Sequence, residues 1–264
     1  MPKPSFKTKI RTKSNAPLLG IFLQIPGPDI AEIVGHAGFD FSIIDTEHGM
    51  FGVDSAIQLV RACDAVGMAS VIRVPFVSHT HITQALDFGV STVMVPRIET
   101  PEDARQAVAA AKFYPDGNRG VCPFTRAASY NALDEPDYYK RSNADTAVLL
   151  QIEGHKGIAN LDAILEVPNI DGILIGPFDL SHSLGIPGKV DDIRVIKAFK
   201  DIIKQAEKRG IAVGNFAVTL KQAHRYIDMG IRFLAFGADT IIMSKVFSEI
   251  RKCILTKSER NISL

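Results

Sequence analysis

Residues 147–180 read AVLLQIEGHKGIANLDAILEVPNIDGILIGPFDL, and this stretch decides the fold class. Two short and largely apolar runs, Val148–Glu153 and Gly172–Gly176, are typical of buried β-strands. The amphipathic segment between them, Gly157–Glu166, is predicted to be a helix. Two neighbouring parallel strands need a long crossover connection, which is usually helical. The stretch therefore predicts a βαβ unit of a parallel sheet.

The same pattern occurs along the rest of the chain. We expect six further strands, at Gly20–Leu23, Phe41–Asp45, Val71–Val74, Thr92–Pro96, Ala212–Gly214 and Phe233–Gly237. The other predicted helices are Asp29–Ala37, Asp54–Val66, Thr80–Phe88, Pro101–Phe113, Ile193–Arg209, Leu220–Asp228 and Thr240–Leu255. Eight βα units in 264 residues average about 33 residues each, which favours a closed (β/α)8 TIM barrel over an open doubly wound sheet. We expect one α/β domain over residues 1–264.

Two segments fall outside this repeat. Residues 1–17 hold five Lys or Arg and no acid, so they are expected to form a short basic arm. The arm lacks the apolar stretch of a secretory signal, which makes the cytoplasm the expected location. The segment Tyr114–Asp145 is long and rich in Pro, Gly, Arg and Tyr. We expect it over the barrel mouth or at a subunit contact.

Composition excludes several classes of function. A formal net charge of +1 gives no field to hold nucleic acid, and no apolar run is long enough to span a membrane. The three cysteines are widely spaced and form no CxxC, which argues against a disulfide framework or a cysteine zinc site. The chain has no GxGxxG, so no nucleotide cofactor is expected. A Schiff-base lysine within an apolar strand is also lacking.

Polar residues cluster where the predicted strands end, which is where barrels carry their active sites. The second strand ends in Asp45, followed by His48, and Arg73 lies within the apolar third strand. A buried arginine charge is costly unless it faces carboxylates or an anionic ligand. The candidate site residues at these strand ends are Asp45, His48, Arg73, Gln151, Glu153 and Asp179.

Glu153 and Asp179 come from adjacent strands and offer two carboxylates without a nearby cysteine pair. Such donors suit a hard divalent cation, Mg²⁺ or Mn²⁺ and also Co²⁺, with water and substrate as the remaining ligands. The cation could chelate a 2-oxo acid and stabilise its enolate. Arg73 could stabilise the same oxyanion, and His48 could move the proton.

Six short motifs occur in order along the chain: IIDTEHG at 43–49, RVP at 73–75, VPRIET at 95–100, NRGV at 118–121, QIE at 151–153 and IGPFDL at 175–180. Together they resemble the HpcH/HpaI-type class II aldolases of the phosphoenolpyruvate/pyruvate barrel superfamily. The resemblance runs from about residue 19 to the last helix. It implies the same barrel, assembled as a homo-hexamer whose last helix is exchanged between subunits.

The resemblance also implies roles for single residues. Glu153 and Asp179 hold the metal, His48 is the acid/base, and Arg73 stabilises the enolate. Gln151 and the backbone around Phe178 contact the keto acid, and Asp87 supports the basicity of the histidine; we group Asp45 with these catalytic residues. The implied reaction splits 4-hydroxy-2-oxo acids into pyruvate and an aldehyde.

Two arginines depart from the family pattern. Arg97 stands where an apolar residue is expected, and Arg126 belongs to the long segment after the fourth strand. A guanidinium suits bidentate recognition of a carboxylate, so both are candidates for binding a second acidic group on the substrate. The other reading of these residues is structural, as ion-pair partners of Glu99 or Glu153.

Two alternatives stay open at this point. The same enolate chemistry could join oxaloacetate to an acetyl donor to form citrate, as in some siderophore pathways. A barrel that binds a keto acid without turning it over is the third possibility, although the chain retains every proposed catalytic position.

Overall fold

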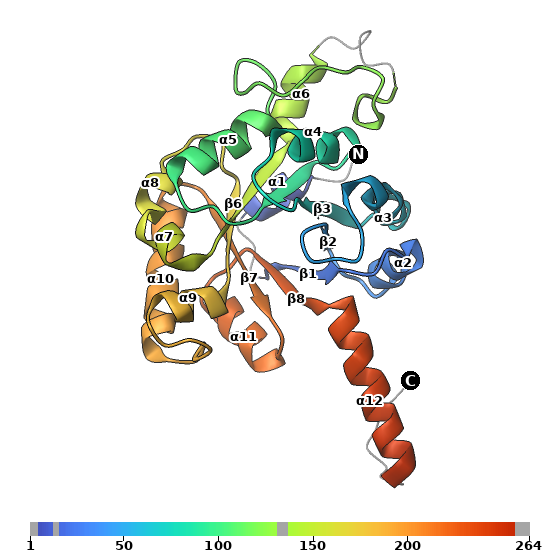
Figure 1. The fold of residues 1–264 in the computed structure, drawn as a ribbon, viewed down its shortest axis with the longest axis vertical. Coiled ribbons are helices and arrows are strands. Elements are labelled where there is room, and N and C mark those ends of the chain that lie inside the picture. The colour runs from blue at the N-terminus through green and yellow to red at the C-terminus, as the bar shows by residue number, and fades with distance from the viewer. Residues whose placement is uncertain (1–4, 13–15, 131–136, 257–264) are drawn as a thin grey trace.

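The chain forms a closed barrel of eight parallel strands with helices around it (Figure 1). The computed structural model describes residues 5–12, 16–130 and 137–256. Every strand pairs with the next, and β8 closes the barrel against β1. This confirms the TIM barrel. The strands are β1 Leu18–Leu23, β2 Phe41–Asp45, β3 Ala69–Arg73, β4 Thr92–Val95, β5 Ala147–Ile152, β6 Gly172–Ile175, β7 Ala212–Ala217 and β8 Phe233–Ala238.

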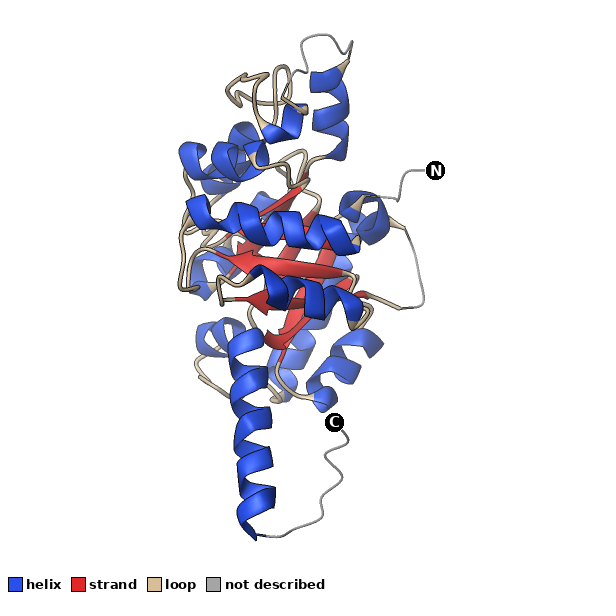
Figure 2. Ribbon diagram, turned by 90° about the vertical axis from the view of Figure 1, so that its right-hand side faces the viewer, coloured by secondary structure: helices blue, strands red, loops and turns tan. Residues whose placement is uncertain are grey.

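The helices follow the predicted order, and several are added or divided. The segment expected as one helix after β5 is two short helices that meet at Asn160. Figure 2 shows the red strands of the barrel within a layer of blue helices. The helices are α1 Phe6–Arg11, α2 Pro28–His36, α3 Val53–Val66, α4 His79–Asp87, α5 Pro101–Ala111, α6 Tyr138–Asp145, α7 Gly154–Ala159, α8 Leu161–Leu165, α9 Pro177–Ser183, α10 Ile193–Lys208, α11 Leu220–Asp228 and α12 Asp239–Thr256, with a 3₁₀ turn η1 at Arg126–Ala128.

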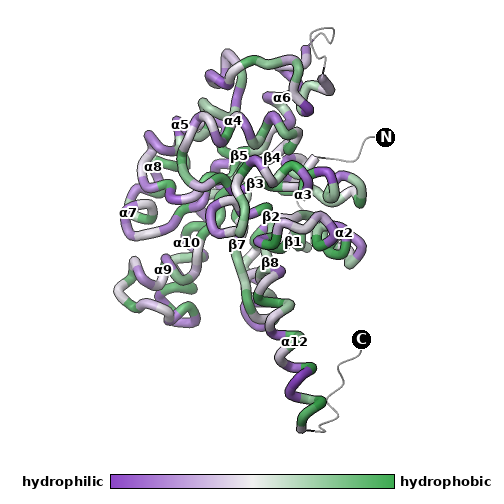
Figure 3. Tube along the Cα trace, turned by 45° about the vertical axis from the view of Figure 1, so that its right-hand side comes forward, coloured by the Kyte–Doolittle hydropathy of each residue, from purple (hydrophilic) through white to green (hydrophobic). Residues whose placement is uncertain are grey.

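Side chains alternate between the barrel interior and the surrounding helices, as the period of two in a strand requires. Aromatic rings fill part of the interior, and two glycines make room for them. A Cβ at Gly20 would lie 2.4 Å from the Phe41 ring, and one at Gly214 would lie 2.1 Å from the Phe233 ring. The strands are accordingly the hydrophobic centre of the molecule in Figure 3.

Helix α1 packs against the barrel interior at the N-terminal ends of the strands. The Phe6 ring lies edge-on to Phe41 and Phe233, with ring centroids 5.2 and 5.9 Å apart. Outside this contact, Arg11 donates to the buried Asp171 carboxylate at 2.7 Å. Burying a phenylalanine contributes about 1.5–3 kcal/mol. Part of the segment expected as a basic arm is therefore a helical plug, and the sequence analysis missed this helix.

The described parts of the long segment between α5 and β5, residues 112–130 and 137–146, do not cover the barrel mouth. The segment follows a helix, and a helix in a βα unit returns the chain to the N-terminal ends of the strands. There η1 contacts α4, and α6 leads directly into β5. The expectation of a position over the mouth overlooked this direction. Its alternative, a subunit contact, stays a prediction.

Helix α12 projects away from the barrel, and in Figure 1 it is the long helix that extends from the end of β8. Only its first residue, Asp239, is buried. Phe247, Ile254 and Leu255 are more than 60% exposed, which is unusual for large apolar side chains on a single helix. Among the described residues, no helix is both long and apolar enough to cross a bilayer.

Candidate active site

The strand register brings Asp45 and Arg73 together at the C-terminal end of the barrel. They are direct cross-strand neighbours in the β2–β3 pair. The guanidinium donates from Nε to Asp45 Oδ1 at 2.9 Å and from Nη2 to Oδ2 at 2.7 Å. Both side chains are at least 92% buried, and the Phe22 ring lies under the guanidinium at 4.9 Å. The pair is thus a bidentate ion pair of fixed geometry.

The Asp45 carboxylate also shapes the turn that carries the histidine. Its Oδ1 accepts the backbone N–H groups of Glu47 and His48, each at 3.1 Å. Burial pushes the pKa of Asp45 upward, but the opposing effects of Arg73, Gln24 and the His48 amide hold that pKa below its usual value. Asp45 is therefore ionised at neutral pH and acts as a positioning residue for both Arg73 and His48.

Gln151 connects this ion pair to Glu153. Its Oε1 accepts from Arg73 Nη1 at 3.3 Å, and its Nε2 donates to Glu153 Oε2 at 2.8 Å. Gln151 near the end of β5 and Glu153 directly after it lie two residues apart, so the alternation along the strand turns both side chains to the same side. One row of hydrogen bonds therefore runs from Asp45 through Arg73 and Gln151 to Glu153.

Four carboxylates line one cavity beyond this row. They are Glu47, Glu99, Glu153 and Asp179, and His48 lines the same cavity. The pKa of Glu153 is raised by burial first, and then by the charges of Asp179 and Glu47. Burial and these charges together disfavour the ionised form of Glu153, whereas Glu47 is paired with Arg73 and Arg97, each at 3.2 Å.

Gly176 gives the Asp179 carboxylate its room. A Cβ at this glycine would lie 2.3 Å from Asp179 Oδ2. The carboxylates of Glu153 and Asp179 are hard oxygen donors, so they fit a divalent cation. Within the described residues, no group of three or more His, Cys, Asp or Glu is arranged to hold a metal by protein atoms alone.

Arg97 lies at the rim of the same cavity. Its φ of 55° is in the left-handed region, which is uncommon for a residue with a side chain and often marks a functional site. The strained backbone directs its N–H to Glu153 Oε1 at 3.0 Å, and its Nε lies 3.2 Å from Glu47 Oε1. The side chain is 67% exposed. Its ion-pair partner is thus Glu47 and not the expected Glu99 or Glu153.

An adjoining cavity of about 180 Å³ shares Asp179 with the first one. Arg73 and Gln151 form its polar side, and Phe22, Phe178 and Phe216 form its apolar side. Phe178, in the first turn of α9, is half-exposed there. A small molecule in this cavity could contact both the Arg73 guanidinium and the Asp179 carboxylate.

Sequence reasoning missed Gln24 in this site. Gln24 follows β1 directly, lines the cavity and donates to Asp45 Oδ2 at 3.0 Å. The signal that could have found it is the one used for the other strands, a polar residue directly after an apolar run.

Two of the expected site residues lie elsewhere in this chain. Asp87, at the end of α4, accepts from Arg119 at 2.6 Å. Arg126 pairs with Asp64 at 2.6 Å and donates to the Phe88 carbonyl. Neither residue lines the cavities at the strand ends, because both belong to the outer layer near the N-terminal ends of the strands.

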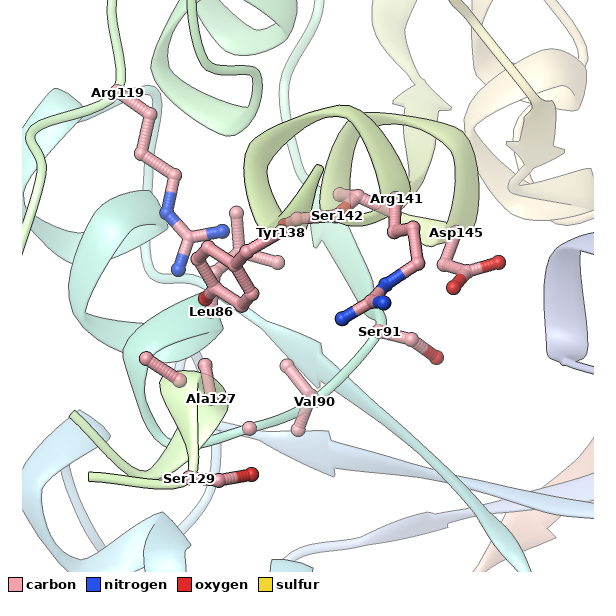
Figure 4. A pocket seen from close by; sticks show the side chains of 13 residues that line it. Leu86, Val90, Ser91, Arg119, Ala127, Ser129, Tyr138, Arg141, Ser142 and Asp145 are labelled. Carbon is pink, nitrogen blue, oxygen red and sulfur yellow. The ribbon is translucent and has the colours of Figure 1, made fainter. Parts of the chain in front are cut away.

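A further cavity in that outer layer is shown in Figure 4. Arg119, Tyr138 and Arg141 surround it, together with residues at the ends of α4 and α6. Asp145 is its one lining carboxylate. The cavity thus lacks the paired carboxylates that distinguish the mouth of the barrel.

The repulsion at Glu153 predicts a gain of stability when its charge is removed. With the cation removed by a chelator, Glu153→Gln is expected to raise Tm at pH 7 by about 1–3 °C. Folding raises the pKa of this carboxyl, so its charge destabilises the folded state above the unfolded pKa. The gain should disappear as the pH falls below the unfolded value.

Calorimetry in EDTA at several pH values tests this expectation. Glu102→Gln is the control, because Glu102 is an exposed carboxyl whose pKa is lowered by a hydrogen bond from Arg105. A lower Tm for Glu153→Gln at pH 7 would show that its hydrogen bonds outweigh the repulsion.

Comparison with known proteins identifies the family of this chain. A family model described as HpcH/HpaI aldolase/citrate lyase matches residues 18–245. A hydroxypyruvate/pyruvate aldolase of Deinococcus radiodurans is 38% identical over 244 residues, covering 92% of this chain and 87% of that protein. A 4-hydroxy-2-oxo-heptane-1,7-dioate aldolase of Escherichia coli is 34% identical, with 91% of each chain covered.

Solved structures show the same architecture. A HpcH/HpaI aldolase/citrate lyase family protein from Burkholderia cenocepacia superposes with a TM-score of 0.86 at 32% identity, covering 94% of this chain and 98% of that one. The citrate synthase SbnG superposes with a TM-score of 0.84 at 26% identity, covering 97% and 99%. The fold is thus shared by carbon–carbon lyases and by a citrate-forming enzyme.

Proposed function

Because the chain belongs to the HpcH/HpaI aldolase/citrate lyase family and is a lyase enzyme, we propose that it cleaves and forms 4-hydroxy-2-oxo acids through the enolate of pyruvate. The observation that carries this proposal is the shared cavity of Arg73, Gln151 and Asp179. In that cavity the buried guanidinium of Arg73 lies on one side, and the carboxylate of Asp179, one of the two proposed metal ligands, lies on the other. An enolate with its neighbouring carboxylate is an anion of matching size and charge.

Glu153 and Asp179 would hold a divalent cation, Mg²⁺, Mn²⁺ or Co²⁺, at this place. When bound, the cation supplies Lewis-acid polarisation of a keto oxygen. The fit rests on hard oxygen donors, on the burial and the neighbouring carboxylates that raise the pKa of Glu153, and on the space that Gly176 leaves for Asp179. Site geometry and cation availability decide among these three cations, since all of them accept carboxylate oxygens.

The chain's own side chains would do the rest of the chemistry. Arg73 would stabilise the oxyanion that develops as the carbon–carbon bond breaks, and it is already oriented by Asp45. Gln151 and the backbone around Phe178 would contact the keto acid. His48, at the exposed rim, would take or return the proton, directly or through a water.

Assembly is part of the proposal. Helix α12 leaves its own barrel with large apolar side chains exposed, which suits exchange with a neighbouring subunit in a homo-oligomer, and we propose a hexamer. Asp87 does not contact His48 within the described part of one chain. Its proposed role in supporting the histidine therefore requires the Asp87 of an adjacent subunit.

Citrate formation is the second candidate, favoured by the structural likeness to a citrate synthase and by the extra arginine at the rim. Turnover assays distinguish the two reactions. Release of pyruvate from a 4-hydroxy-2-oxo acid supports the aldolase, whereas release of CoA from acetyl-CoA with oxaloacetate supports the condensation. Failure of both with every cation tested would contradict both.

Arg97 is proposed to select a second acidic group on the substrate. In Arg97→Met, the ratio of kcat/KM for an acidic to that for a neutral acceptor aldehyde is expected to fall by about 10-fold or more, since a charge-assisted hydrogen bond contributes about 1.5–3 kcal/mol. Steady-state kinetics with succinic semialdehyde and propanal measure this ratio.

The same ratio of kcat/KM values is measured for Arg126→Ala. The contact of Arg126 with Asp64 predicts an unchanged ratio within one chain, while a changed ratio would place Arg126 at the substrate of a neighbouring subunit. If Arg97→Met leaves the ratio unchanged, Arg97 serves only to neutralise Glu47.

A further inference from the structure

We propose that Gln24 is a positioning residue that ties the Asp45–Arg73 pair to the first turn of α12. The inference rests on the proposed role of Arg73 in the reaction and adds a residue outside the six motifs. It assigns to the base of α12 a function in catalysis as well as in the fold.

Both ends of the Gln24 amide are used. Its Nε2 donates to Asp45 Oδ2 at 3.0 Å, and its Oε1 accepts from Thr240 Oγ1 at 2.9 Å. The ionised Asp45 carboxylate can only accept, so a flip of the amide would place Gln24 Oε1 against Asp45 Oδ2 and lose this hydrogen bond. Asp45 thereby determines the orientation of the amide, and the Thr240 hydroxyl holds its other end.

The backbone at Gln24 is held from the same helix. The Asp239 carboxylate, which is 3% exposed, accepts the N–H of Gln24 at 3.0 Å and that of Ile25 at 3.0 Å. It also accepts the N–H of Thr240 at 2.7 Å. The end of β1 and the start of α12 are therefore joined through one buried carboxylate.

This link reaches Arg73 through Asp45. Oδ2 of Asp45 accepts from Arg73 Nη2 and from Gln24 Nε2. Without the Gln24 amide, Oδ2 keeps only the arginine as a partner, so this side of the carboxylate is held less firmly, while Oδ1 keeps Arg73 Nε and the backbone N–H groups of Glu47 and His48. The guanidinium is held by this carboxylate at two points, so its direction at the reacting oxygen would be fixed less firmly.

The hydrogen bond to Gln24 comes from the first turn of α12, where the helix leaves the barrel. Beyond its first residue the helix has no buried side chain among those described. The direction of α12 relative to the barrel thus depends on the contacts of its first turn and on any molecule that packs against the rest of the helix. The Thr240–Gln24 hydrogen bond is one of these contacts. A change in the direction of α12 would therefore move Gln24 and, through it, Asp45.

The test uses Gln24→Met, Thr240→Val and the double variant, assayed on the full-length enzyme with saturating Mg²⁺ and a cleavable 4-hydroxy-2-oxo acid. Met keeps the volume of Gln24 and removes its amide, and Val keeps the shape of Thr240 and removes its hydroxyl. Gln106→Met is the matched control, since Gln106 bonds only Glu102 on the exposed face of α5 in the described structure.

We expect Gln24→Met to lower kcat by about 5–20-fold with KM within about twofold, because a misdirected Arg73 weakens transition-state binding more than substrate binding. Thr240→Val should lower kcat by about threefold. The double variant should match Gln24→Met alone, as expected for residues that act through one link. Gln106→Met should behave as wild type.

Three outcomes would overturn the proposal: an unchanged kcat in Gln24→Met, additive effects in the double variant, or a loss of activity fully explained by a lower folded fraction in a thermal melt. Arg73→Ala in the same assay separates this from the proposed function. If Arg73→Ala is as active as wild type, the proposed site itself is wrong. If Arg73→Ala is inactive and Gln24→Met is not impaired, only the role of Gln24 fails.

Discussion

Replacement of Arg73 by alanine is expected to lower kcat by about 10²–10³, the usual effect of losing one stabiliser of an oxyanion, with little change in cation affinity. The guanidinium is fixed by Asp45 before any substrate binds, and Phe22 packs under it. Little reorganisation is then needed when negative charge develops on the substrate. Steady-state kinetics and a calorimetric titration with Mn²⁺ measure the two quantities separately.

A second pair of variants controls for folding. Arg73→Ala leaves the buried Asp45 without its partner, which typically costs about 3–5 kcal/mol. Arg73→Ala combined with Asp45→Asn removes the unpaired charge and should recover stability while kcat stays low. Arg73→Lys keeps the charge without the bidentate geometry, so an intermediate kcat is expected. A double variant with the wild-type rate would show that Arg73 only neutralises Asp45.

The sequence was sufficient to predict the elements on which this pair depends. Each strand is a short apolar run whose alternation is local, and Asp45 and Arg73 occupy equivalent ends of adjacent runs. In a barrel, such ends must converge. The meeting of Arg73, Gln151 and Asp179 in one cavity follows from that rule and from the strand order.

The positions of other residues depend on contacts between distant parts of the chain, which no local sequence pattern predicts. Phe6 closes the barrel interior because two aromatic rings there lack a covering layer, and nothing in residues 1–17 shows this. Arg126 is directed by the path of a long connection and by Asp64, which is far away in sequence. Asp87 likewise pairs across such a connection, with Arg119.

Removal of the divalent cation is expected to abolish turnover. EDTA in excess should stop the reaction, and Mg²⁺, Mn²⁺ or Co²⁺ should restore it, since Glu153 and Asp179 supply only part of an octahedral shell and keep positions open for substrate. Full activity in excess EDTA would contradict a metal-dependent reaction.

Variants of single carboxylates test whether Glu153 and Asp179 are the residues that bind the cation. Glu153→Ala or Asp179→Ala should raise the Mn²⁺ concentration for half-saturation by about 10²-fold or more, because each removes a direct ligand. Glu102→Ala, on the exposed face of α5, should leave that concentration unchanged. Calorimetric titration with Mn²⁺ in the absence of substrate measures this directly and does not depend on activity. Unchanged Mn²⁺ affinity in both ligand variants would move the cation to another place, whereas a loss in only one would reveal which strand end holds it.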